Sequence, residues 1–464
     1  MTRSREIKEK CGLFGIFDVE GAAELMYYGL HALQHRGQEG CGMVMTSGGE
    51  MRIIKGEGLI VDNFDERRLR YLSGRRGIGH VMAGKDSGAD ASEIEPFIFK
   101  HRFTDFAIAH NGSVVNFNEI REKLERSGRL FHSDSDAELL AQLLIANLRD
   151  DFTAALVAAL RQMEGGFSFL IMTPDKIYAT RDKHGLRPLS LGRCNGGHVL
   201  ASETCAFDII GADFERDLVP GEILILSAEG LESLKYSDYS RRYLCAMELA
   251  YFARPDSNLE GANVHTFRRA SGKALAGEHP APGDIVVGVP DSSISAAMGY
   301  AEAAGLPYEI GLIKNRYIAR TFIQPSRKIR EKAVRLKLSS IVSVVRGKRV
   351  ILVDDSIVRG TTCRRIVGLL KEAGASAVHV RIAAPQITHP CFYGVDFTTY
   401  EEIIGAFNSK ERIRRAIGAD SLEYLSLESF FKASCRSELC AACFTGKYPT
   451  NIYQALIEAN KKRN

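Results

Sequence analysis

The segment Val350 to Thr362 carries side chains that could bind a phosphorylated sugar. It reads Val-Ile-Leu-Val-Asp-Asp-Ser-Ile-Val-Arg-Gly-Thr-Thr, an apolar strand that ends in two acids before a helix begins. At the carboxyl edge of a parallel sheet, Asp354 and Asp355 can hold ribose hydroxyls and help to bind Mg²⁺. The hydroxyls of Thr361 and Thr362, with backbone N–H groups at the helix start, can receive a phosphate. The lysine of a Walker sequence is absent, so the segment indicates a different phosphate-binding loop.

This segment resembles the signature with which the type I phosphoribosyltransferases bind phosphoribosyl pyrophosphate (PRPP). The resemblance implies that Asp354 and Asp355 contact the ribose and the metal. It also implies that the residues from Asp355 to Thr362, including Ser356 and Gly360, surround the 5′-phosphate.

A second segment, Gly288 to Ile294, also leaves a strand and enters a helix. It reads Gly-Val-Pro-Asp-Ser-Ser-Ile and resembles the pyrophosphate-binding segment of the same family. The resemblance implies that Asp291 and Ser293 lie beside the pyrophosphate and that Ser292 is a magnesium ligand.

A third segment, Lys314 to Ile323, is basic and follows a predicted strand. It resembles the loop that closes over PRPP in the type I phosphoribosyltransferases. Lys314, Arg316 and Arg320 would then supply the positive charge that a leaving pyrophosphate needs.

Cys11 begins a different set of motifs near the N-terminus. Residues 11–16 read Cys-Gly-Leu-Phe-Gly-Ile, and residues 35–40 read His-Arg-Gly-Gln-Glu-Gly. Both resemble the glutaminase domain of the class II amidotransferases, which are N-terminal nucleophile hydrolases. The resemblance implies that residues 1–10 are a propeptide whose removal makes Cys11 the first residue. Its free α-amino group, with an ordinary pKa of about 7.7 to 8.0, could then act as base for the Cys11 thiol.

Other residues of this half match the same glutaminase family one by one. The Asn111 side chain and the Gly112 N–H, within Ala-His-Asn-Gly, match the oxyanion hole for the tetrahedral intermediate. Asp136 matches the acid that holds the α-amino group of glutamine, and Arg36 matches an arginine near the nucleophile.

Position 82 departs from the glutaminase pattern. After Ile-Gly-His-Val at 78–81 the family places an arginine that binds the glutamine α-carboxylate, whereas this chain has Met82. Methionine cannot donate a hydrogen bond, and a charge-assisted bond contributes roughly 1.5 to 3 kcal/mol. Either Lys85 or a neighbouring arginine replaces that contact, or the use of glutamine is weakened.

Cys440 and Cys443 form a Cys-x-x-Cys pair near the C-terminus. That spacing alone is used by zinc sites, redox pairs and iron–sulfur clusters. The iron–sulfur branch of the PRPP amidotransferases has two further ligands, which match Cys245 and Cys391 here. The resemblance therefore favours a 4Fe-4S cluster that ties the tail to the body, with zinc as the alternative.

The motifs from Cys11 to Tyr453 follow one order, which resembles the glutamine PRPP amidotransferases of the iron–sulfur type. The resemblance implies a transferase of purine biosynthesis in which glutamine is hydrolysed at Cys11. The ammonia would pass inside the protein to C1 of PRPP and displace pyrophosphate, giving 5-phosphoribosylamine and glutamate. It also implies a homotetramer that purine nucleotides inhibit.

Two other functions compete with this interpretation. A transferase with a weakened glutaminase would draw mainly on free ammonia. A PRPP-binding regulator would keep the sugar-phosphate loop but would need neither a nucleophile nor a closing loop, and this chain retains both.

The elements that must position these residues differ between the two halves. From Cys11 to about Arg241, short alternating strands such as Phe167 to Met172 and Lys176 to Thr180 are interrupted by helical stretches. The helical stretches are Asp136 to Leu148 and Thr153 to Met163. This pattern favours sheets with helices outside, and the resemblance implies the αββα sandwich of the N-terminal nucleophile hydrolases, an α+β fold, over 11–241.

From about Arg242 to the C-terminus, apolar strands alternate with helices. The expected elements are the strands Asp284 to Val289, Arg349 to Val353 and Val378 to Ala383, and the helices Ser293 to Ala304 and Thr361 to Ala373. Strands that are apolar on both faces predict a parallel, doubly wound α/β sheet. The resemblance implies that this sheet belongs to a type I phosphoribosyltransferase domain over 242–464, with a cluster-binding tail at its C-terminal end.

The composition of the 464 residues points to small-molecule partners. With 61 basic and 57 acidic residues and no basic block, nothing suggests binding to nucleic acid. The sequence shows no secretory signal and no apolar run of the roughly 20 residues that would span a membrane. We therefore expect a cytoplasmic location. Ten cysteines in a reducing compartment should be catalytic, metal-bound or inert, and we expect inert core thiols at Cys41, Cys194, Cys205 and Cys363.

Overall fold

The computed structural model describes residues 11–83, 93–239, 241–315 and 338–451. The predicted propeptide, residues 1–10, lies outside this range, as do Lys85, Arg316 and Arg320.

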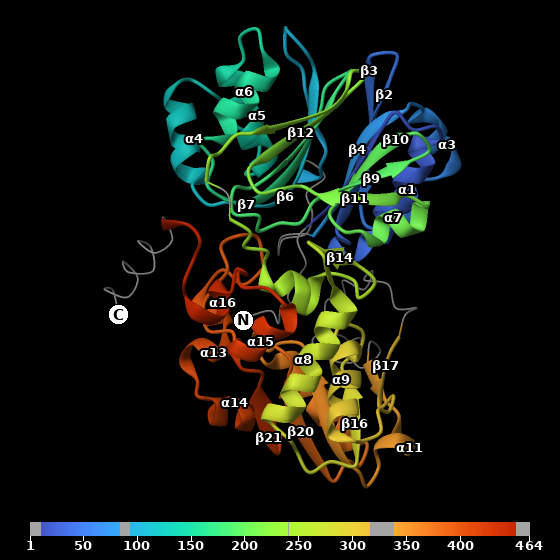
Figure 1. The fold of residues 1–464 in the computed structure, drawn as a ribbon, viewed down its shortest axis with the longest axis vertical. Helices are drawn as coiled ribbons and strands as arrows, with labels where there is room; N and C mark the ends of the chain where they lie inside the picture. The colour runs from blue at the N-terminus through green and yellow to red at the C-terminus, as the bar shows by residue number, and fades with distance from the viewer. Residues whose placement is uncertain (1–10, 84–92, 240, 316–337, 452–464) are drawn as a thin grey trace, which may run out of the picture.

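The first half contains two antiparallel sheets packed face to face, at the top of Figure 1. One sheet has seven strands in the order β11-β9-β10-β1-β4-β2-β3, and the other has six in the order β13-β12-β8-β7-β6-β5. The strands of the first sheet are β1 (Gly12–Phe17), β2 (Gly40–Ser47), β3 (Glu50–Glu57), β4 (Arg76–Met82), β9 (Ser190–Cys194), β10 (Gly197–Ala201) and β11 (Asp213–Asp217). Those of the second are β5 (Phe97–Phe99), β6 (Phe106–Val114), β7 (Gly165–Met172), β8 (Ile177–Arg181), β12 (Glu222–Ser227) and β13 (Gly230–Lys235).

Helices cover the outer face of each sheet and complete four layers. On the seven-stranded sheet they are α1 (Ala22–Ala32), η1 (Gln34–Arg36), α2 (Ile60–Asn63), α3 (Glu66–Tyr71) and α7 (Cys205–Ile210); on the six-stranded sheet they are α4 (Phe117–Arg126), α5 (Asp136–Asn147) and α6 (Phe152–Leu160). Side chains such as Leu13 and Ile78 from one sheet and Leu170 and Leu224 from the other fill the space between the sheets. The αββα sandwich is therefore confirmed.

The second half is built on a four-stranded parallel sheet in the order β16-β19-β20-β21. Its strands are β16 (Ile285–Gly288), β19 (Arg349–Asp354), β20 (Ala377–Ile382) and β21 (Ser421–Tyr424). Alternate residues of β19 serve different cores: Ile351 packs with the residues of α8 (Val264–Glu278) and α9 (Ile294–Ala304), and Leu352 with those of α12 (Thr361–Glu372) and α14 (Lys410–Ile417). The predicted doubly wound sheet is thus confirmed, with helices on both faces.

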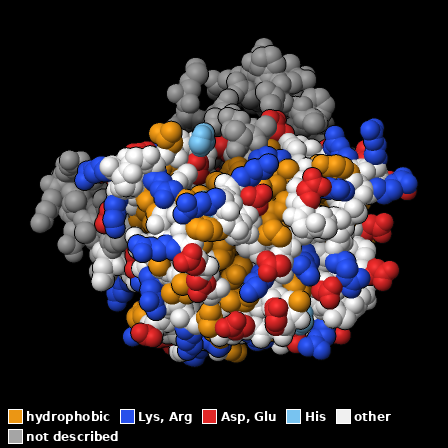
Figure 2. Space-filling model, turned by 90° about the horizontal axis from the view of Figure 1, so that it is seen from above, with side chains coloured by type: hydrophobic (Ala, Val, Ile, Leu, Met, Phe, Trp, Pro, Cys, Tyr) orange, Lys and Arg blue, Asp and Glu red, His pale blue; other side chains and the backbone are white. Residues whose placement is uncertain are grey.

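Shorter elements join these layers or carry the tail. They are the π-helix η3 (Glu248–Phe252), β14 (Asn258–Leu259), β15 (Ala262–Asn263), β17 (Leu312–Lys314), β18 (Leu338–Ser340), α11 (Val342–Val345), η4 (Tyr400–Glu402), α13 (Ile404–Phe407), α15 (Leu427–Ser434) and α16 (Ala442–Thr445). Among the described residues, no helix has the length and apolar character needed to cross a bilayer. On the face seen in Figure 2, basic and acidic side chains are intermixed.

Candidate active sites

Cys11 lies directly before β1, a central strand of the seven-stranded sheet. Because Leu13 pairs with His80 on β4 and side chains alternate along strands, Cys11, His80 and Met82 share one face of the sheet. Cys11 and Met82 are both buried and belong to one small apolar cluster with Ile94. The predicted nucleophile is therefore enclosed, with an apolar methionine near it.

His80 activates the Cys11 thiol electrostatically. Burial by itself raises the pKa of Cys11, but His80, with a smaller effect from His110, outweighs burial and lowers that pKa from 9.0 to about 7. His80 is 1% exposed, and neither of its ring nitrogens has a geometrically defined hydrogen-bond partner among the described residues. A thiol of this kind is substantially ionised near neutral pH, as a nucleophilic cysteine requires.

Glu95 and His110, which act electrostatically on Cys11, form a pair that was not predicted from the sequence. Glu95 Oε1 lies 2.7 Å from His110 Nδ1 and accepts from Ser135 Oγ over 2.8 Å, while Glu95 Oε2 accepts from the His110 N–H over 2.7 Å. Nε2 of the same ring lies 3.4 Å from Asp136 Oδ2. Burial lowers the pKa of His110, but the two carboxylates outweigh it and hold that pKa well above its ordinary value. Asp136, the predicted ligand of the glutamine α-amino group, is thus oriented by a charged histidine.

Asn111 and Gly112 lie together on β6, as an oxyanion hole requires. The Asn111 side chain is fully buried, and both of its polar atoms lack a partner among the described residues. A buried amide without partners is costly, so its position favours a ligand there. Gly112 has a φ of 126°, and a Cβ at this position would lie 2.0 Å from the Gly166 carbonyl oxygen. Only glycine fits this backbone position.

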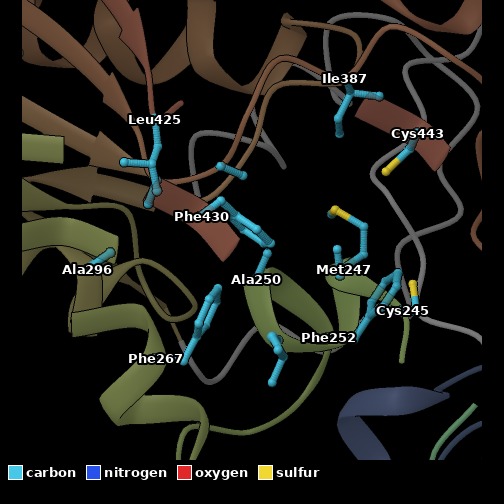
Figure 3. Packing of buried hydrophobic residues seen from close by; sticks show 14 of the residues in the cluster. Cys245, Met247, Ala250, Phe252, Phe267, Ala296, Ile387, Leu425, Phe430 and Cys443 are labelled. Carbon is cyan, nitrogen blue, oxygen red and sulfur yellow. The ribbon is translucent and has the colours of Figure 1, made fainter. Parts of the chain in front are cut away.

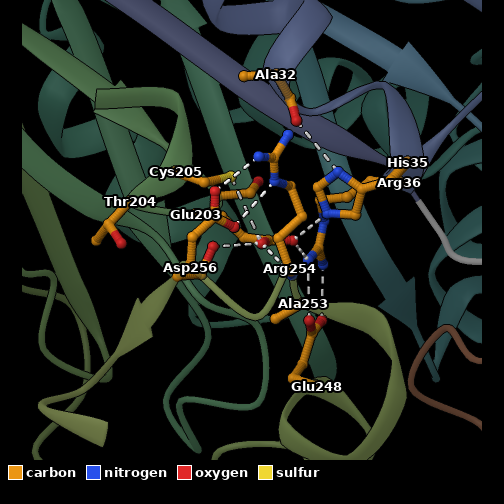
Figure 4. Close-up of polar contacts among 12 residues, drawn as sticks. Ala32, His35, Arg36, Glu203, Thr204, Cys205, Glu248, Ala253, Arg254 and Asp256 are labelled. Carbon is orange, nitrogen blue, oxygen red and sulfur yellow. Dashed lines mark hydrogen bonds and ion pairs between the residues drawn. The ribbon is translucent and has the colours of Figure 1, made fainter. Parts of the chain in front are cut away.

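The Arg36 side chain contacts the backbone of Cys11, the predicted nucleophile. Its Nε donates to the Cys11 carbonyl over 3.1 Å, and the rest of its guanidinium is bound by Glu203 and Glu248. Figure 4 shows both acids around this guanidinium. The two acids were not predicted, because no local motif marks them.

The predicted PRPP residues converge where β19 ends. Asp354 and Asp355 are buried, and the serines that follow β16 bind them: Ser293 Oγ donates to Asp354 Oδ1 over 3.0 Å, and Ser292 Oγ donates to Asp355. Burial, reinforced by the neighbouring charge of Asp355, raises the pKa of Asp354, and burial also raises the pKa of Asp355. Two acids held this way favour a cation close by.

The phosphate-binding loop continues from these acids into a helix start. Ser356 Oγ donates to Asp355 Oδ1 over 2.8 Å, and α12 begins at Thr361 after Gly360, whose φ is 75°. Thr361 and Thr362 are exposed, so the first turn of the helix is open to a ligand. Its N–H groups have no partner within the helix, as anion binding requires.

Lys314 ends strand β17, and its ammonium lies 3.1 Å from Asp291 Oδ2. The predicted pyrophosphate ligands Lys314 and Asp291 are therefore neighbours. The other two basic residues of this segment, Arg316 and Arg320, lie outside the described residues.

The four predicted cluster cysteines line one enclosed cavity. The walls are Leu186, Arg187, Cys245, Met247, Cys391, Tyr393, Val395, Phe397, Cys440, Ala442, Cys443 and Tyr448. Figure 3 shows Cys245 and Cys443 among the hydrophobic residues of this core. Burial raises the pKa values of Cys440 and Cys443 well above the ordinary value, and the electrostatic effect of the other cysteines raises them further. In the part of the chain that the structure describes, no three His, Cys, Asp or Glu side chains are arranged to hold a single metal ion.

The cysteines predicted to be inert are buried elsewhere. Burial raises the pKa of Cys41 to about 12 and that of Cys363 well above its ordinary value. Burial likewise raises the pKa values of Cys194 and Cys205. These thiols stay protonated near neutral pH, in contrast to Cys11.

Comparison with known proteins finds the same two activities in the same order. Residues 88–208 match the family "glutamine amidotransferase domain", and residues 267–390 match the family "phosphoribosyl transferase domain". An amidophosphoribosyltransferase of Bacillus subtilis is 50% identical over 458 residues, 97% of this chain and 96% of the relative. One from Staphylococcus aureus strain Mu50 is 46% identical over 464 residues, 98% of this chain and 94% of the relative.

Solved structures agree with these relatives. A glutamine PRPP amidotransferase from B. subtilis, complexed with ADP and GMP, superposes with a TM-score of 0.91 at 50% identity, covering 96% of this chain and 98% of that chain. A structure described as the allosteric regulatory enzyme of purine biosynthesis superposes with a TM-score of 0.92 at 49% identity, covering 96% of this chain and 97% of that chain.

Proposed function

The chain belongs to the amidophosphoribosyltransferase family, and on that premise we propose how its residues divide the reaction between two sites. Its activity joins the hydrolysis of glutamine to the amination of PRPP. We assign residues 1–10 to a propeptide, 11–241 to the glutaminase and 242–464 to the phosphoribosyltransferase with its cysteine-bearing tail. The observation that carries the assignment is the enclosure of Cys11 by Arg36 and His80, with Asp354 and Asp355 at the end of the parallel sheet in the other half.

At the first site the Cys11 thiolate attacks the carboxamide carbon of glutamine. The Asn111 side chain and the Gly112 N–H donate to the oxygen that becomes negative in the tetrahedral intermediate. Collapse of that intermediate breaks the C–N bond, ammonia leaves after taking up a proton, and a thioester remains, which water hydrolyses to glutamate. Once residues 1–10 are removed, the free α-amine of Cys11 can carry the proton. Asp136 binds the α-ammonium of glutamine.

At the second site ammonia attacks C1 of PRPP and pyrophosphate leaves. Asp354 and Asp355 hold the ribose hydroxyls, and the loop from Ser356 through Gly360 to Thr361 and Thr362 binds the 5′-phosphate with N–H groups and hydroxyls. The pyrophosphate lies beside Asp291 and Ser293, with Lys314, Arg316 and Arg320 as its cationic partners.

Mg²⁺ fits the acids of this second site. Burial raises the pKa values of Asp354 and Asp355, and a cation bound beside them would favour their charged forms. Ser292, Asp354 and Asp355 would hold the ion, directly or through water, and it would neutralise the charge that develops on the departing pyrophosphate.

We propose a 4Fe-4S cluster rather than a single zinc ion at the cysteine cavity. Cys245, Cys391, Cys440 and Cys443 line this cavity together, and their positions match the four cluster ligands of the iron–sulfur branch of the family. The cluster would bind the tail to the body of the transferase half and would take no part in either half-reaction.

The remaining proposals concern partners and location. Since a relative was solved in complex with ADP and GMP, we propose that purine nucleotides bind this enzyme and inhibit it. We also propose that it is a homotetramer. A cysteine-bound cluster and free thiols suit the reducing cytoplasm.

Met82 supports a second candidate, an enzyme that uses mainly free ammonia. This side chain is apolar, buried and close to the nucleophile, where the resemblance calls for an arginine that binds the substrate carboxylate. Glutamine-dependent and ammonia-dependent PRPP consumption, measured on the same preparation, separates the two candidates.

Mass spectrometry of the N-terminus should accompany that assay. Full glutamine-dependent activity from a chain that still begins at Met1 would refute the maturation step. A chain beginning at Cys11 that consumes PRPP with ammonia but not with glutamine would establish the second candidate.

A further inference from the structure

A carboxylate of the transferase half completes the support of the glutaminase nucleophile. Arg36 NH1 donates to Glu248 Oε2 over 2.9 Å and NH2 donates to Glu248 Oε1 over 2.8 Å, a two-pronged pair. The same guanidinium donates through Nε to the Cys11 carbonyl. Arg36 and Glu248 are 1% and 0% exposed, so water does not weaken their attraction.

Glu248 begins the π-helix η3, which the transferase half holds from its other side. Arg268 on α8 donates to the Leu249 carbonyl over 2.9 Å and to the Ala253 carbonyl over 2.8 Å. Its third nitrogen donates to the Ser292 carbonyl over 3.4 Å, within the predicted PRPP loop. A π-helix inside a protein frequently marks a functional position. Here it lies between the two candidate active sites.

Glu203 of the glutaminase half binds the chain just beyond η3. Its Oε1 accepts from Arg36 over 2.5 Å, and its Oε2 accepts from the Arg254 N–H over 2.9 Å and from Ser257 Oγ over 2.7 Å. Figure 4 shows Glu203 together with Arg36 and Arg254. The segment from Glu248 to Ser257 is thus fixed to the glutaminase at both of its ends.

We propose that Glu248 is a positioning residue for glutamine hydrolysis, supplied by the transferase half. The inference rests on Cys11 being the nucleophile. A guanidinium is planar, so two bonds to one carboxylate fix the plane in which Nε points at the Cys11 carbonyl. Without the Glu248 carboxylate, the Arg36 guanidinium is bound by only one acid, Glu203, and its plane can rotate. The Cys11 backbone then loses its alignment with the oxyanion donors on β6.

Glu248→Gln tests the proposal, and Glu260→Gln is a matched control. Glu260 is likewise buried and joins the two halves, through Arg181 at 2.5 Å and Arg436 at 2.7 Å, but it contacts neither candidate site. Glutamate release, ammonia-dependent PRPP consumption and melting temperature are measured for both variants. Mass spectrometry of each N-terminus allows rates to be expressed per processed chain.

A positioning role predicts that Glu248→Gln lowers kcat for glutamate release by roughly 10- to 100-fold, the effect of a displacement of about 1 Å at a reacting group. KM for glutamine should change less than about threefold because Glu248 does not touch this substrate. Ammonia-dependent synthesis by Glu248→Gln, and both activities of Glu260→Gln, should stay within about twofold of the original enzyme.

Equal losses in the two variants, or a parallel loss of ammonia-dependent synthesis in Glu248→Gln, would show that Glu248 serves only the fold and would overturn the proposal. If Glu248→Gln does not accumulate, Glu248→Asp takes its place. It keeps the buried charge but withdraws the carboxylate by one methylene, and the same selective fall in kcat is expected. If the unsubstituted enzyme releases no glutamate, the proposed glutaminase itself is refuted.

Discussion

Cys245 and Cys440 lie side by side although they come from opposite ends of the transferase half. The Ala246 N–H donates to the Cys440 carbonyl over 3.0 Å, and the Cys440 N–H donates to the Leu244 carbonyl over 2.9 Å. The tail is therefore joined to the segment that leads into η3, on which Glu248 lies. The cysteine cavity and the Arg36 contact depend on the same stretch of chain.

The cluster proposal predicts that Cys440→Ser loses bound iron and lowers the melting temperature. Metal binding is linked to folding, and a loss of about 3 kcal/mol would lower the melting temperature by roughly 6 to 12 °C in a domain of this size. Iron content and unfolding are measured without oxygen. Cys435→Ser is the control, because Cys435 is exposed and lies outside the cavity. Unchanged iron in Cys440→Ser would refute the cluster.

The assignment of two separate sites predicts that Cys11→Ala abolishes glutamine-dependent synthesis and leaves ammonia-dependent synthesis intact. Loss of a nucleophile should reduce glutamine-dependent synthesis by at least about a thousandfold. Ammonia reaches C1 of PRPP without the thiol, so PRPP consumption with ammonium salts should stay close to that of the original enzyme. An equal fall in both assays would show that the two sites are not chemically separate.

The environment of Cys11 predicts a pH dependence set by His80. With a thiol pKa of about 7, alkylation of Cys11 should slow as the pH falls through 7, because the thiolate becomes protonated. In His80→Gln, the imidazole that offsets the burial of Cys11 is gone, so the pKa of the Cys11 thiol should rise. Alkylation at pH 7 should then fall by roughly fivefold or more, since a rise of one unit leaves about a tenth of the thiol ionised.

Peptide mass spectrometry resolves the alkylation of Cys11 from that of the other cysteines. His184→Gln serves as the control, because His184 is also a buried histidine of the glutaminase half whose ring nitrogens have no hydrogen-bond partner among the described residues. If the pH midpoint of Cys11 alkylation is the same in His80→Gln as in the original enzyme, another group activates the Cys11 thiol.

The sequence predicted those site residues whose local pattern and element boundary coincide. β19 ends at Asp354 and α12 begins at Thr361, where an apolar run meets acids and a glycine precedes hydroxyls. The helix predicted to reach Met163 ends at Leu160 instead. Beyond that point the Gln162 and Met163 N–H groups bond to carbonyls three residues back, so the last turn tightens and leaves the α-helix.

The residues that the sequence did not predict pair across long distances along the chain. Glu95 meets His110 because β5 and β6 are adjacent strands, and Glu248 meets Arg36 because the two halves pack together. Neither pairing leaves a periodic or spaced pattern in either partner's own segment. His80 was visible in its motif, but its effect on Cys11 depends on the register between β1 and β4, which only the folded sheet provides.

Met82 gives the prediction that decides whether glutamine is a good substrate. It ends β4, is 7% exposed, and occupies the place where the family pattern has a carboxylate-binding arginine. If nothing replaces that arginine, KM for glutamine should be high, and Met82→Arg should lower it by roughly tenfold or more, as one charge-assisted hydrogen bond would. Ammonia-dependent turnover should not change, since that route bypasses the pocket. Met82→Leu, which keeps the site apolar, should leave KM unaltered.

Lys85 is the competing source of a positive charge, and it lies outside the described residues. Its ammonium could attract the glutamine carboxylate as a point charge but could not grip both oxygens as an arginine does. Glutamine kinetics of Lys85→Ala, measured beside Met82→Arg, therefore separate two pockets. A large rise in KM for Lys85→Ala with no gain from Met82→Arg would mean that the pocket has been rebuilt around lysine. An unchanged KM for Lys85→Ala together with a lower KM for Met82→Arg would mean that the chain kept its nucleophile and oxyanion hole but lost the contact that binds the substrate carboxylate.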